Sequence, residues 1–310
     1  MQANDEIRSS SSAYHTPVLL TEIMEHLQIN PSGIYVDCTF GGGGHSKAIL
    51  QKLNEKGRVV AFDQDADAKQ NLPDDSRLLF VPQNFRHLQR FLRLNGIAEV
   101  DGLLADLGVS SHQFNEASRG FSIRYEGQLD MRMDQRQEKT ATDIVKNYSE
   151  IQLHKLFEQY GEVTNAKTLA RTIVEKRKTT SLQTIEGFKN ALFETVKGNP
   201  NKYLAQVFQA LRMEVNDEEG ALKEMLEQIP GVLKKGGRAA IITFHSIEDR
   251  QVKIFFRKGT FITEDENPFI TKEVENKLKL VNKKPIVAAP EETKKNPRAR
   301  SAKLRVAEKK

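Results

Sequence analysis

The chain of 310 residues is 38% hydrophobic and 29% charged, which excludes a wholly disordered protein and suits one large or two modest domains. Its single cysteine excludes an internal disulfide and a Cys-rich zinc site, and no apolar run reaches the roughly 18–20 residues of a membrane span. We therefore expect a cytoplasmic protein with no membrane partner. The formal net charge of +5 hides an asymmetry, because residues 271–310 contain 13 Lys+Arg and 5 Asp+Glu, against 34 and 37 in the first 270 residues. An acidic body with a basic tail is typical of proteins that bind polyanions, although solvated lysines produce the same pattern.

The first hundred residues alternate between apolar strands and amphipathic helices. Residues 1–13, with the serine run Ser9–Ser12, lack both an apolar core and a basic leader, so we predict a flexible N-terminus rather than a signal peptide. Strands are predicted over residues 34–40, 58–63, 78–83 and 101–107. Helices are predicted between them over residues 45–54 and 86–94. Strands that alternate with helices are typical of βαβ units and a parallel sheet.

The pattern changes to helices alone from Ser111 to Lys197, where no buried strand is predicted. A capping box at Ser149–Gln152 opens one helix. Helical spacing predicts two more over residues 165–178 and 181–196, the second with Phe193 on its apolar face. This segment reads as an all-helical module.

The alternating pattern resumes after the helices. Asn216–Asp217 are predicted to cap a helix, and a fifth buried strand follows over residues 238–244. The later segments 277–281 and 303–306 alternate in the manner of half-exposed strands. We therefore predict an α/β domain in two parts, interrupted by a helical domain. The boundaries are 14–110 and 214–310 for the α/β domain, and 111–213 for the insertion.

Four glycines, Gly41–Gly44, follow the first strand and open a helix, an arrangement typical of sites for nucleotide-like ligands. Their spacing matches neither a P-loop nor the dinucleotide pattern Gly-x-Gly-x-x-Gly. Asp63 ends the second strand, where a carboxylate can accept both hydroxyls of a ribose. Asp37 lies inside the first strand, and an acid there suits a ligand with an ammonium group and a sulfonium charge. Together these residues favour S-adenosylmethionine over a plain structural turn.

Ten short motifs then occur in a fixed order along the chain. They are His15-Thr-Pro-Val-Leu, Asp37-Cys-Thr-Phe-Gly-Gly-Gly-Gly-His-Ser46, Phe62-Asp-Gln-Asp65, Asp106-Leu-Gly-Val-Ser-Ser111, Arg119-Gly-Phe-Ser, Asp130-Met-Arg-Met-Asp134, Phe208-Gln-Ala-Leu-Arg212, Val215-Asn216, Phe244-His-Ser-Ile-Glu-Asp-Arg250 and Asn296-Pro-Arg-Ala-Arg-Ser301. This set closely resembles the MraW/RsmH family of small-subunit ribosomal RNA cytosine-N4 methyltransferases. The resemblance runs from about Tyr14 to Arg305, nearly the whole chain.

The resemblance implies a class I, Rossmann-like methyltransferase sheet with an inserted helical domain for substrate recognition. It implies S-adenosylmethionine as the methyl donor and a cytidine in the decoding region of 16S ribosomal RNA as the acceptor. Phe85 follows the third strand and would stack on the adenine. The chain departs from the family's Tyr-Gly-Glu-Glu-Arg at Val163–Thr164, which removes a charge pair. The family's cofactor contacts fall here on Gly43, Gly44, His45, Asp63, Phe85, Asp106 and Gln113.

The acceptor chemistry points to the end of the fourth strand. A cytosine amine is a poor nucleophile, and its methylation is helped by an acceptor for its N–H, in-line placement and a dry pocket. We expect Asp106, with Ser110 and Ser111 of the following turn, to form the amine side of this pocket. A contact with the cofactor alone is the other role open to Asp106. Methylation at C5 needs a cysteine nucleophile, and Cys38 is expected to be buried inside the first strand and inert.

Recognition of structured RNA needs cations for the phosphates and a target base that is flipped out. Candidate RNA contacts are four arginines near the start of the insertion and two in the basic tail: Arg119, Arg124, Arg132, Arg136, Arg298 and Arg300. His245 after the fifth strand is a candidate contact to the base. The scattered histidines have no metal-ligand spacing, so we expect no catalytic metal.

We therefore expect an enzyme that methylates small-subunit ribosomal RNA, either naked or within the small ribosomal subunit, with a homodimer left open. Two other functions remain: a non-catalytic ribosome-binding factor that keeps the fold, and an oxidoreductase with a nucleotide cofactor on the same sheet. The intact glycine turn with Asp63 and Asp106 argues against lost catalysis. The absent Gly-x-Gly-x-x-Gly argues against the oxidoreductase.

Overall fold

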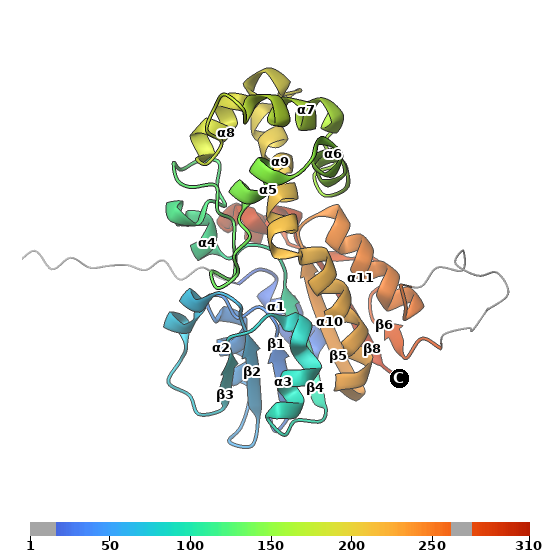
Figure 1. The fold of residues 1–310 in the computed structure, drawn as a ribbon. Helices are drawn as coiled ribbons and strands as arrows, with labels where there is room; N and C mark the ends of the chain where they lie inside the picture. The colour runs from blue at the N-terminus through green and yellow to red at the C-terminus, as the bar shows by residue number, and fades with distance from the viewer. Residues whose placement is uncertain (1–16, 262–274) are drawn as a thin grey trace, which may run out of the picture.

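An eight-stranded mixed sheet forms the centre of the molecule (Figure 1). The computed structural model describes residues 17–261 and 275–310, and the predicted flexible N-terminus, residues 1–13, lies outside them. The strand order is β3-β2-β1-β4-β5-β8-β6, with β7 paired to β8. The strands are β1 (Ile34–Asp37), β2 (Arg58–Phe62), β3 (Leu78–Val81), β4 (Val100–Asp106), β5 (Leu233–Thr243), β6 (Leu278–Leu280), β7 (Ile286–Val287) and β8 (Lys303–Lys309).

The five predicted strands pair in parallel, which confirms the α/β fold. Val36 of β1 lies opposite Val60 of β2 on one side and Leu103 of β4 on the other. All three are buried, as expected for parallel strands that helices cover on both faces. The carboxyl ends of β1, β2, β4 and β5 meet at one edge, where ligands bind in sheets of this kind.

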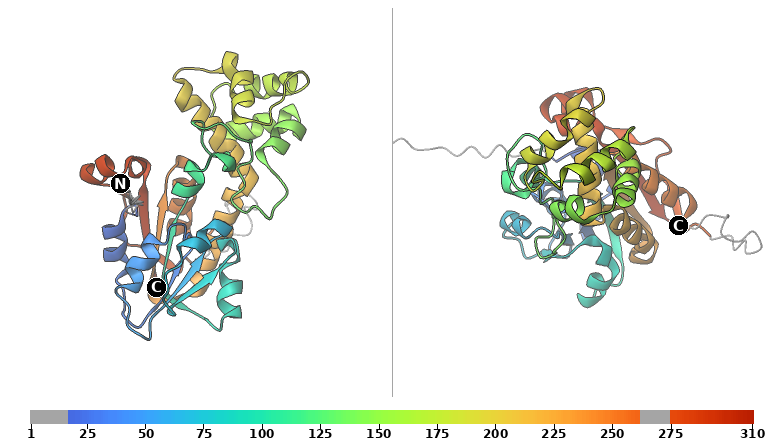
Figure 2. Two further views of the ribbon diagram at one scale, coloured as in Figure 1. Left: turned by 90° about the vertical axis from the view of Figure 1, so that its left-hand side faces the viewer. Right: turned by 45° about the horizontal axis from the view of Figure 1, so that its top comes forward.

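Helices cover both faces of the sheet. On one face, α1 (Leu20–Leu27) and α2 (Gly44–Leu50) share a core with the inward side chains of the strands. On the other face lie α3 (Leu88–Leu94), α10 (Glu218–Val232) and α11 (Ser246–Lys258). The left view of Figure 2 shows α1 and α2 on one side of the strands and α3 on the other. No described helix combines the length and the apolar character that a membrane crossing requires.

Residues between β4 and β5 build a separate helical unit above the sheet (Figure 1). Its helices pack around their own hydrophobic core, which draws on side chains from Phe121 to Val215. The predicted capping box is confirmed, because the Ser149 hydroxyl accepts from the Gln152 amide and the Gln152 side chain accepts from the Ser149 amide. The helices are α5 (Ala141–Asn147), α6 (Glu150–Gln159), α7 (Ala166–Lys176), α8 (Ile185–Leu192) and α9 (Pro200–Asn216).

Short elements complete the described chain. The glycine-led helix α2 ends at Leu50, four residues before the predicted end. The turn after β4 continues into the short helix α4 (Ser111–Asn115), and the basic tail contains α12 (Pro290–Lys295). The 3₁₀ turns are η1 (Ala66–Asn71), η2 (Phe85–His87), η3 (Ala117–Arg119), η4 (Phe193–Thr195) and η6 (Pro297–Ser301).

The prediction of half-exposed strands in the tail is wrong for β8. This strand pairs antiparallel with β5 along one edge and with β6 and β7 along the other. Residues 304–307 are consequently buried without alternation, because helices and neighbouring strands cover β8 on every side. The tail therefore completes the sheet.

Two side chains in the helical segments also depart from the prediction. Phe193 is 80% exposed, because the chain turns from α-helix into η4 at this residue and leaves the helical spacing. Asn216 does not cap α10. It is the buried last residue of α9, and its amide group donates to the Met131 carbonyl at 2.8 Å and accepts from the Met133 amide at 2.7 Å. Asp217, in the left-handed region with φ of 47°, joins α9 to α10; its backbone amide donates to the Met213 carbonyl, but its side chain does not cap α10.

Leu304→Ala should lower the free energy of unfolding by about 2–4 kcal/mol, because it removes a fully buried side chain from the strand between β5 and β6. Urea denaturation followed by circular dichroism measures the change. Val287→Ala on β7 is the matched control, since Val287 is 59% exposed and should contribute less than about 0.5 kcal/mol. Equal midpoints for the two variants would contradict the interior position of β8.

Candidate active site

A tight glycine turn connects β1 to α2. Gly41 and Gly43 have φ of 49° and 74°, a region that side chains with a Cβ rarely adopt. A Cβ on Gly43 would lie 2.7 Å from the Phe40 ring, and one on Gly44 would lie 2.3 Å from Pro17. Around Gly42, in contrast, the space where a Cβ would lie is open. The turn is therefore packed on its inner side and open on its outer side, where a ligand can approach the backbone.

The Asp63 carboxylate supports this turn from the end of β2. One oxygen accepts from the Gly41 amide at 2.7 Å, and the other accepts from the Asp65 amide at 2.8 Å. Burial raises the pKa of Asp63 to about 6, although both amide hydrogen bonds oppose the shift. Each oxygen keeps a second acceptor position, so the group can still receive hydroxyl donors from a ligand.

Asp106 presents a buried oxygen that nothing in the described chain satisfies. The residue ends β4, and its amide donates to the Thr39 hydroxyl at 2.6 Å. Its side chain is 25% exposed, yet Oδ1 is buried and has no hydrogen-bond partner among the described residues. Burial raises the pKa of Asp106 to about 6, against the opposing charge of His45. A buried acceptor without a donor in the protein is open to a donor from outside it, such as a ligand or a water molecule.

Two buried side chains flank Asp106. His45 Nδ1 lies 3.9 Å from Asp106 Oδ2, and its Nε2 lies 3.0 Å from the Val18 carbonyl, a distance that assigns a proton to Nε2. Asp37 accepts from the Ser46 hydroxyl at 2.7 Å and from the Thr39 amide at 3.1 Å. Burial raises the pKa of Asp37 as well. Asp37 thus holds the start of the turn, and both of its oxygens are already engaged within the chain.

The remaining predicted cofactor residues lie beside the same edge. Phe85 begins η2 and is half-buried against the core under α3 and α10. Gln113 is buried, and its amide donates to Asp65 Oδ2 at 2.6 Å. Ser110, a predicted catalytic residue, caps α4 in a capping box with Gln113. Ser110 and Gln113 therefore fix the turn after Asp106.

Arg119 and Arg132 are engaged within the chain. Arg119 is 4% exposed, pairs with Asp65 and Asp67 at 2.8 Å each, and donates to two backbone carbonyls. Arg132 pairs with Asp130 at 2.7 Å. Their guanidinium groups are occupied by acids of this chain, so we do not propose either as an RNA contact. The sequence prediction missed Asp65, although it lies in a quoted motif, because its partner Arg119 is 54 residues away.

Of the two arginines predicted in the tail, Arg298 contacts the rest of the site and Arg300 is exposed. Arg298 donates to the Ser111 hydroxyl, so the tail lies against the turn that follows Asp106. Arg300, in the same 3₁₀ turn, is exposed and forms no ion pair with any described residue. In Figure 1 the red tail segment lies beside α4, in agreement with this hydrogen bond.

His245 belongs to a network of ion pairs after β5. Its Nε2 lies 3.1 Å from Glu248 Oε1, and Arg212 pairs with Glu218 at 2.7 Å. Burial raises the pKa of Glu248, but His245 and Arg212 together hold it below its usual range. Glu218, His245 and Glu248 are close enough to share a metal ion. Arg212 pairs in a bidentate manner with Glu218, and we interpret the cluster as a polar network that joins α9 and α10 to the start of α11.

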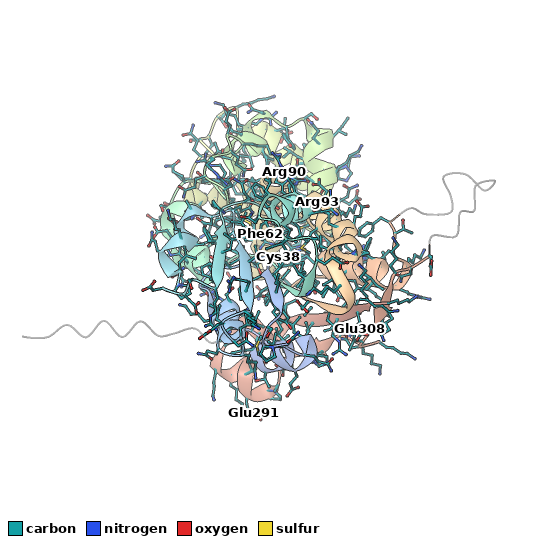
Figure 3. All side chains as sticks on the ribbon, turned by 90° about the horizontal axis from the view of Figure 1, so that it is seen from below. Cys38, Phe62, Arg90, Arg93, Glu291 and Glu308 are labelled. Atoms are coloured by element: carbon teal, nitrogen blue, oxygen red, sulfur yellow. The ribbon has the colours of Figure 1, made fainter. Side chains whose placement is uncertain are left out.

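Cys38 lies one residue beyond β1 rather than inside it. Its side chain is buried, and burial followed by the charge of Asp37 raises the pKa of the thiol well above its ordinary value. Figure 3 labels Cys38 and Phe62 in the interior of the sheet body, surrounded by other side chains. This thiol does not reach the open edge as a nucleophile.

The comparisons with known proteins agree over nearly the full length. The family model described as the MraW methylase family matches residues 12–310. A protein from Parabacteroides distasonis named "Ribosomal RNA small subunit methyltransferase H" is 52% identical over 98% of this chain and 100% of its own. A protein of the same name from Cytophaga hutchinsonii is 51% identical over 95% of this chain and 99% of its own.

Asp106→Asn should raise the free energy of unfolding at pH 8 by about 1–3 kcal/mol. The folded protein holds a proton on Asp106 up to about pH 6, whereas the unfolded chain releases it near the ordinary aspartate pKa of 3.8. The native protein therefore loses stability as the pH rises through this window, and the amide variant does not. Urea midpoints at pH 8 and pH 4 measure the effect, which should shrink at the lower pH.

Asp75→Asn is the matched control with the opposite sign. Its hydrogen bonds with Arg77 lower the pKa of Asp75 to about 2, so the amide should slightly reduce the stability at pH 8. If Asp106→Asn destabilises the protein at pH 8 as Asp75→Asn does, Asp106 is not a strained buried acid.

Proposed function

The chain belongs to the MraW methylase family, and from this premise we propose that it methylates the exocyclic N4 amine of a cytidine in the decoding region of small-subunit (16S) ribosomal RNA. Membership of the family makes the chain a methyltransferase with S-adenosylmethionine as its donor. The observation that carries the finer proposal is the unsatisfied, buried Oδ1 of Asp106 at the carboxyl end of β4. An amine N–H is the donor that such an atom needs.

The residues at the sheet edge fit the donor. The open side of the turn at Gly42 admits a ligand against the backbone, and Asp63 retains acceptor positions for two ribose hydroxyls. Phe85, half-buried after β3, offers a ring for the adenine. We propose Gly43, Gly44, His45 and Gln113 as the residues that shape this pocket. When bound, S-adenosylmethionine supplies an electrophilic methyl group on a sulfonium.

Asp106 has the chemistry that the acceptor requires. The amine nitrogen becomes acidic only as it is methylated, so an acceptor on its N–H is needed more than a strong base. With a pKa of about 6, Asp106 is ionised near neutral pH and can hold the amine in line and then take its proton. A protonated His45, 3.9 Å from the same carboxylate, would stabilise the ionised form. Ser111 lies in the same turn, and we propose that it lines the amine side of the pocket.

The burial of the single cysteine favours the N4 nitrogen of cytosine over the C5 carbon as the methylated atom. Methylation at cytosine C5 requires a cysteine that adds to the ring, and the only cysteine of the chain is the buried Cys38. Transfer to nitrogen needs no covalent intermediate. The position of Asp106 and the burial of Cys38 therefore support the same acceptor atom.

We propose that residues 111–213 form the domain that recognises the RNA, either naked or within the small ribosomal subunit. Its core is separate from the core of the sheet, yet α9 leads directly into α10. Glu162 of this unit accepts from Ser246 at 3.1 Å and pairs with Arg250 at 3.6 Å, both just after β5. Val163, where the family has an acid, is buried in the helical core, so the departure replaces a charge with packing.

Asp106→Asn should lower kcat about 100–1000-fold while the affinity for S-adenosylmethionine changes only a few-fold. The amide can still accept a hydrogen bond, but it cannot take the proton. Methyl transfer to small-subunit RNA from a strain without this enzyme measures kcat, and mass spectrometry of the nucleosides identifies the product. Asp75→Asn, far from the site, is the control and should keep full activity. If the product is 5-methylcytidine, or if Asp106→Asn keeps full activity, the proposal is wrong.

Both site carboxylates have a pKa of about 6, so acidification should act on two kinetic constants. Protonation of Asp106 should lower kcat below pH 6, and protonation of Asp63 should raise the KM for S-adenosylmethionine over the same range. Initial rates between pH 5 and 8 at saturating and at low donor separate the two. A kcat that stays flat down to pH 5 contradicts the role of Asp106.

A further inference from the structure

Two arginines from distant parts of the chain flank one phenylalanine beside the site. The guanidinium carbon of Arg298 lies 5.3 Å from the centre of the Phe114 ring, and that of Arg124 lies 5.8 Å from it. Phe114 belongs to α4, Arg124 to the loop that follows η3, and Arg298 to η6 of the tail. The short helix α4 therefore draws the tail and the helical unit together a few residues after Asp106.

Both arginines lack an ion-pair partner among the described residues. Within residues 17–261 and 275–310, no carboxylate forms an ion pair with Arg124 or with Arg298. The neighbouring arginines differ: Arg119, Arg132 and Arg136 each pair with an aspartate at 2.7–2.8 Å. Burial, and then repulsion from Arg124, lower the pKa of Arg298. Two cations held together without an acid leave this spot ready for an anion.

The two arginines are held in different ways. Arg298 is half-buried and donates to the Ser111 hydroxyl and, at 3.3 Å, to Asn115. Arg124 is exposed, and its guanidinium group donates no hydrogen bond to a described residue. A half-buried cation beside an exposed one suits a ligand that arrives from solvent.

The surroundings identify the anion. S-adenosylmethionine carries no phosphate, so a phosphate here must come from the acceptor. Tyr125, next to Arg124, is 41% exposed, and an exposed ring beside unpaired arginines is typical of surfaces that bind single-stranded RNA. Arg298 contacts Ser111, the first residue of the helix that follows the turn after Asp106, so a phosphate held here would lie near the proposed target nucleotide.

We infer that Arg124 and Arg298, spaced by the Phe114 ring, form a clamp for a backbone phosphate of the RNA next to the methylated nucleotide. The inference rests on the proposed function and adds to it the residues that hold the acceptor strand. The clamp assigns RNA binding to Arg298 of the basic tail, while β8 of the same tail completes the sheet.

Arg124→Gln, Arg298→Gln and the double variant test the clamp. Each single variant should bind a small-subunit ribosomal RNA transcript about 5–20-fold more weakly at 0.15 M KCl, because one phosphate contact is lost. The slope of log affinity against log salt should fall in magnitude by about 0.7–0.9 for each arginine. The affinity for S-adenosylmethionine should stay unchanged in all three.

Arg93→Gln is the matched control. Arg93 is an exposed arginine on α3, and Figure 3 shows it far from Glu291 of α12, the segment that leads to Arg298. This variant should keep both the RNA affinity and the salt slope. Arg298→Lys retains the charge and should keep the slope while losing part of the affinity, which a merely structural role of Arg298 does not predict.

The results of these experiments distinguish failure of the clamp from failure of the proposed function. If the wild type methylates the RNA and Arg124→Gln binds it with unchanged affinity and slope, the clamp is overturned and the proposed function stands. If the variants lose affinity for S-adenosylmethionine instead, the arginines serve the donor carboxylate and the inference is equally overturned. A wild type that neither binds nor methylates the RNA overturns the proposed function itself. Arg124 is exposed and makes no side-chain hydrogen bond to the described chain, so its variant should fold normally.

Discussion

The buried carboxylate of Asp65 connects the three parts of the site. The backbone amide of Asp65 donates to Asp63, while its side chain accepts from Gln113 of α4 and pairs with the buried Arg119. Arg119 in turn donates to the carbonyls of residues 132 and 133, at the base of the helical unit. Removing one partner of a buried ion pair typically costs about 3–5 kcal/mol, because the other charge remains without compensation. This buried network therefore joins the donor pocket to the base of the helical unit, in addition to the contacts of Glu162 with Ser246 and Arg250.

The sheet body could be predicted from the sequence because its signals are local. Apolar runs bounded by glycine and acids mark β1, β2 and β4, and the change to helical spacing after Ser111 marks the inserted unit. A glycine turn after the first strand and an acid after the second place the edge of the sheet where ligands bind. The unpartnered oxygen of Asp106, in contrast, is visible only once its surroundings are known.

Predictions failed wherever the environment of a side chain depends on residues far along the chain. Nothing within the tail reveals that β8 is covered on both edges, since its partners β5 and β6 are separate segments. The buried role of Asn216 depends on Met131 and Met133, more than 80 residues earlier. For the same reason, both Arg119 and Arg298 are predicted from the sequence as RNA contacts. The structure distinguishes them, because two aspartates pair with Arg119 and no described carboxylate pairs with Arg298.

Because β8 lies in the interior of the sheet, the sheet cannot be completed until this C-terminal strand has been synthesised. β5 exposes an unpaired edge until β8 arrives, and the hydrogen-bonded residues Thr243 and Lys303 are 60 residues apart. Unpaired edges of apolar strands readily join other chains, and pairings of long sequence separation form slowly. A newly made chain therefore passes through a stage in which most of the catalytic groups are already synthesised while the sheet is still open to aggregation. Chaperone dependence and inclusion-body formation should respond to changes in this strand more than to changes at the active site.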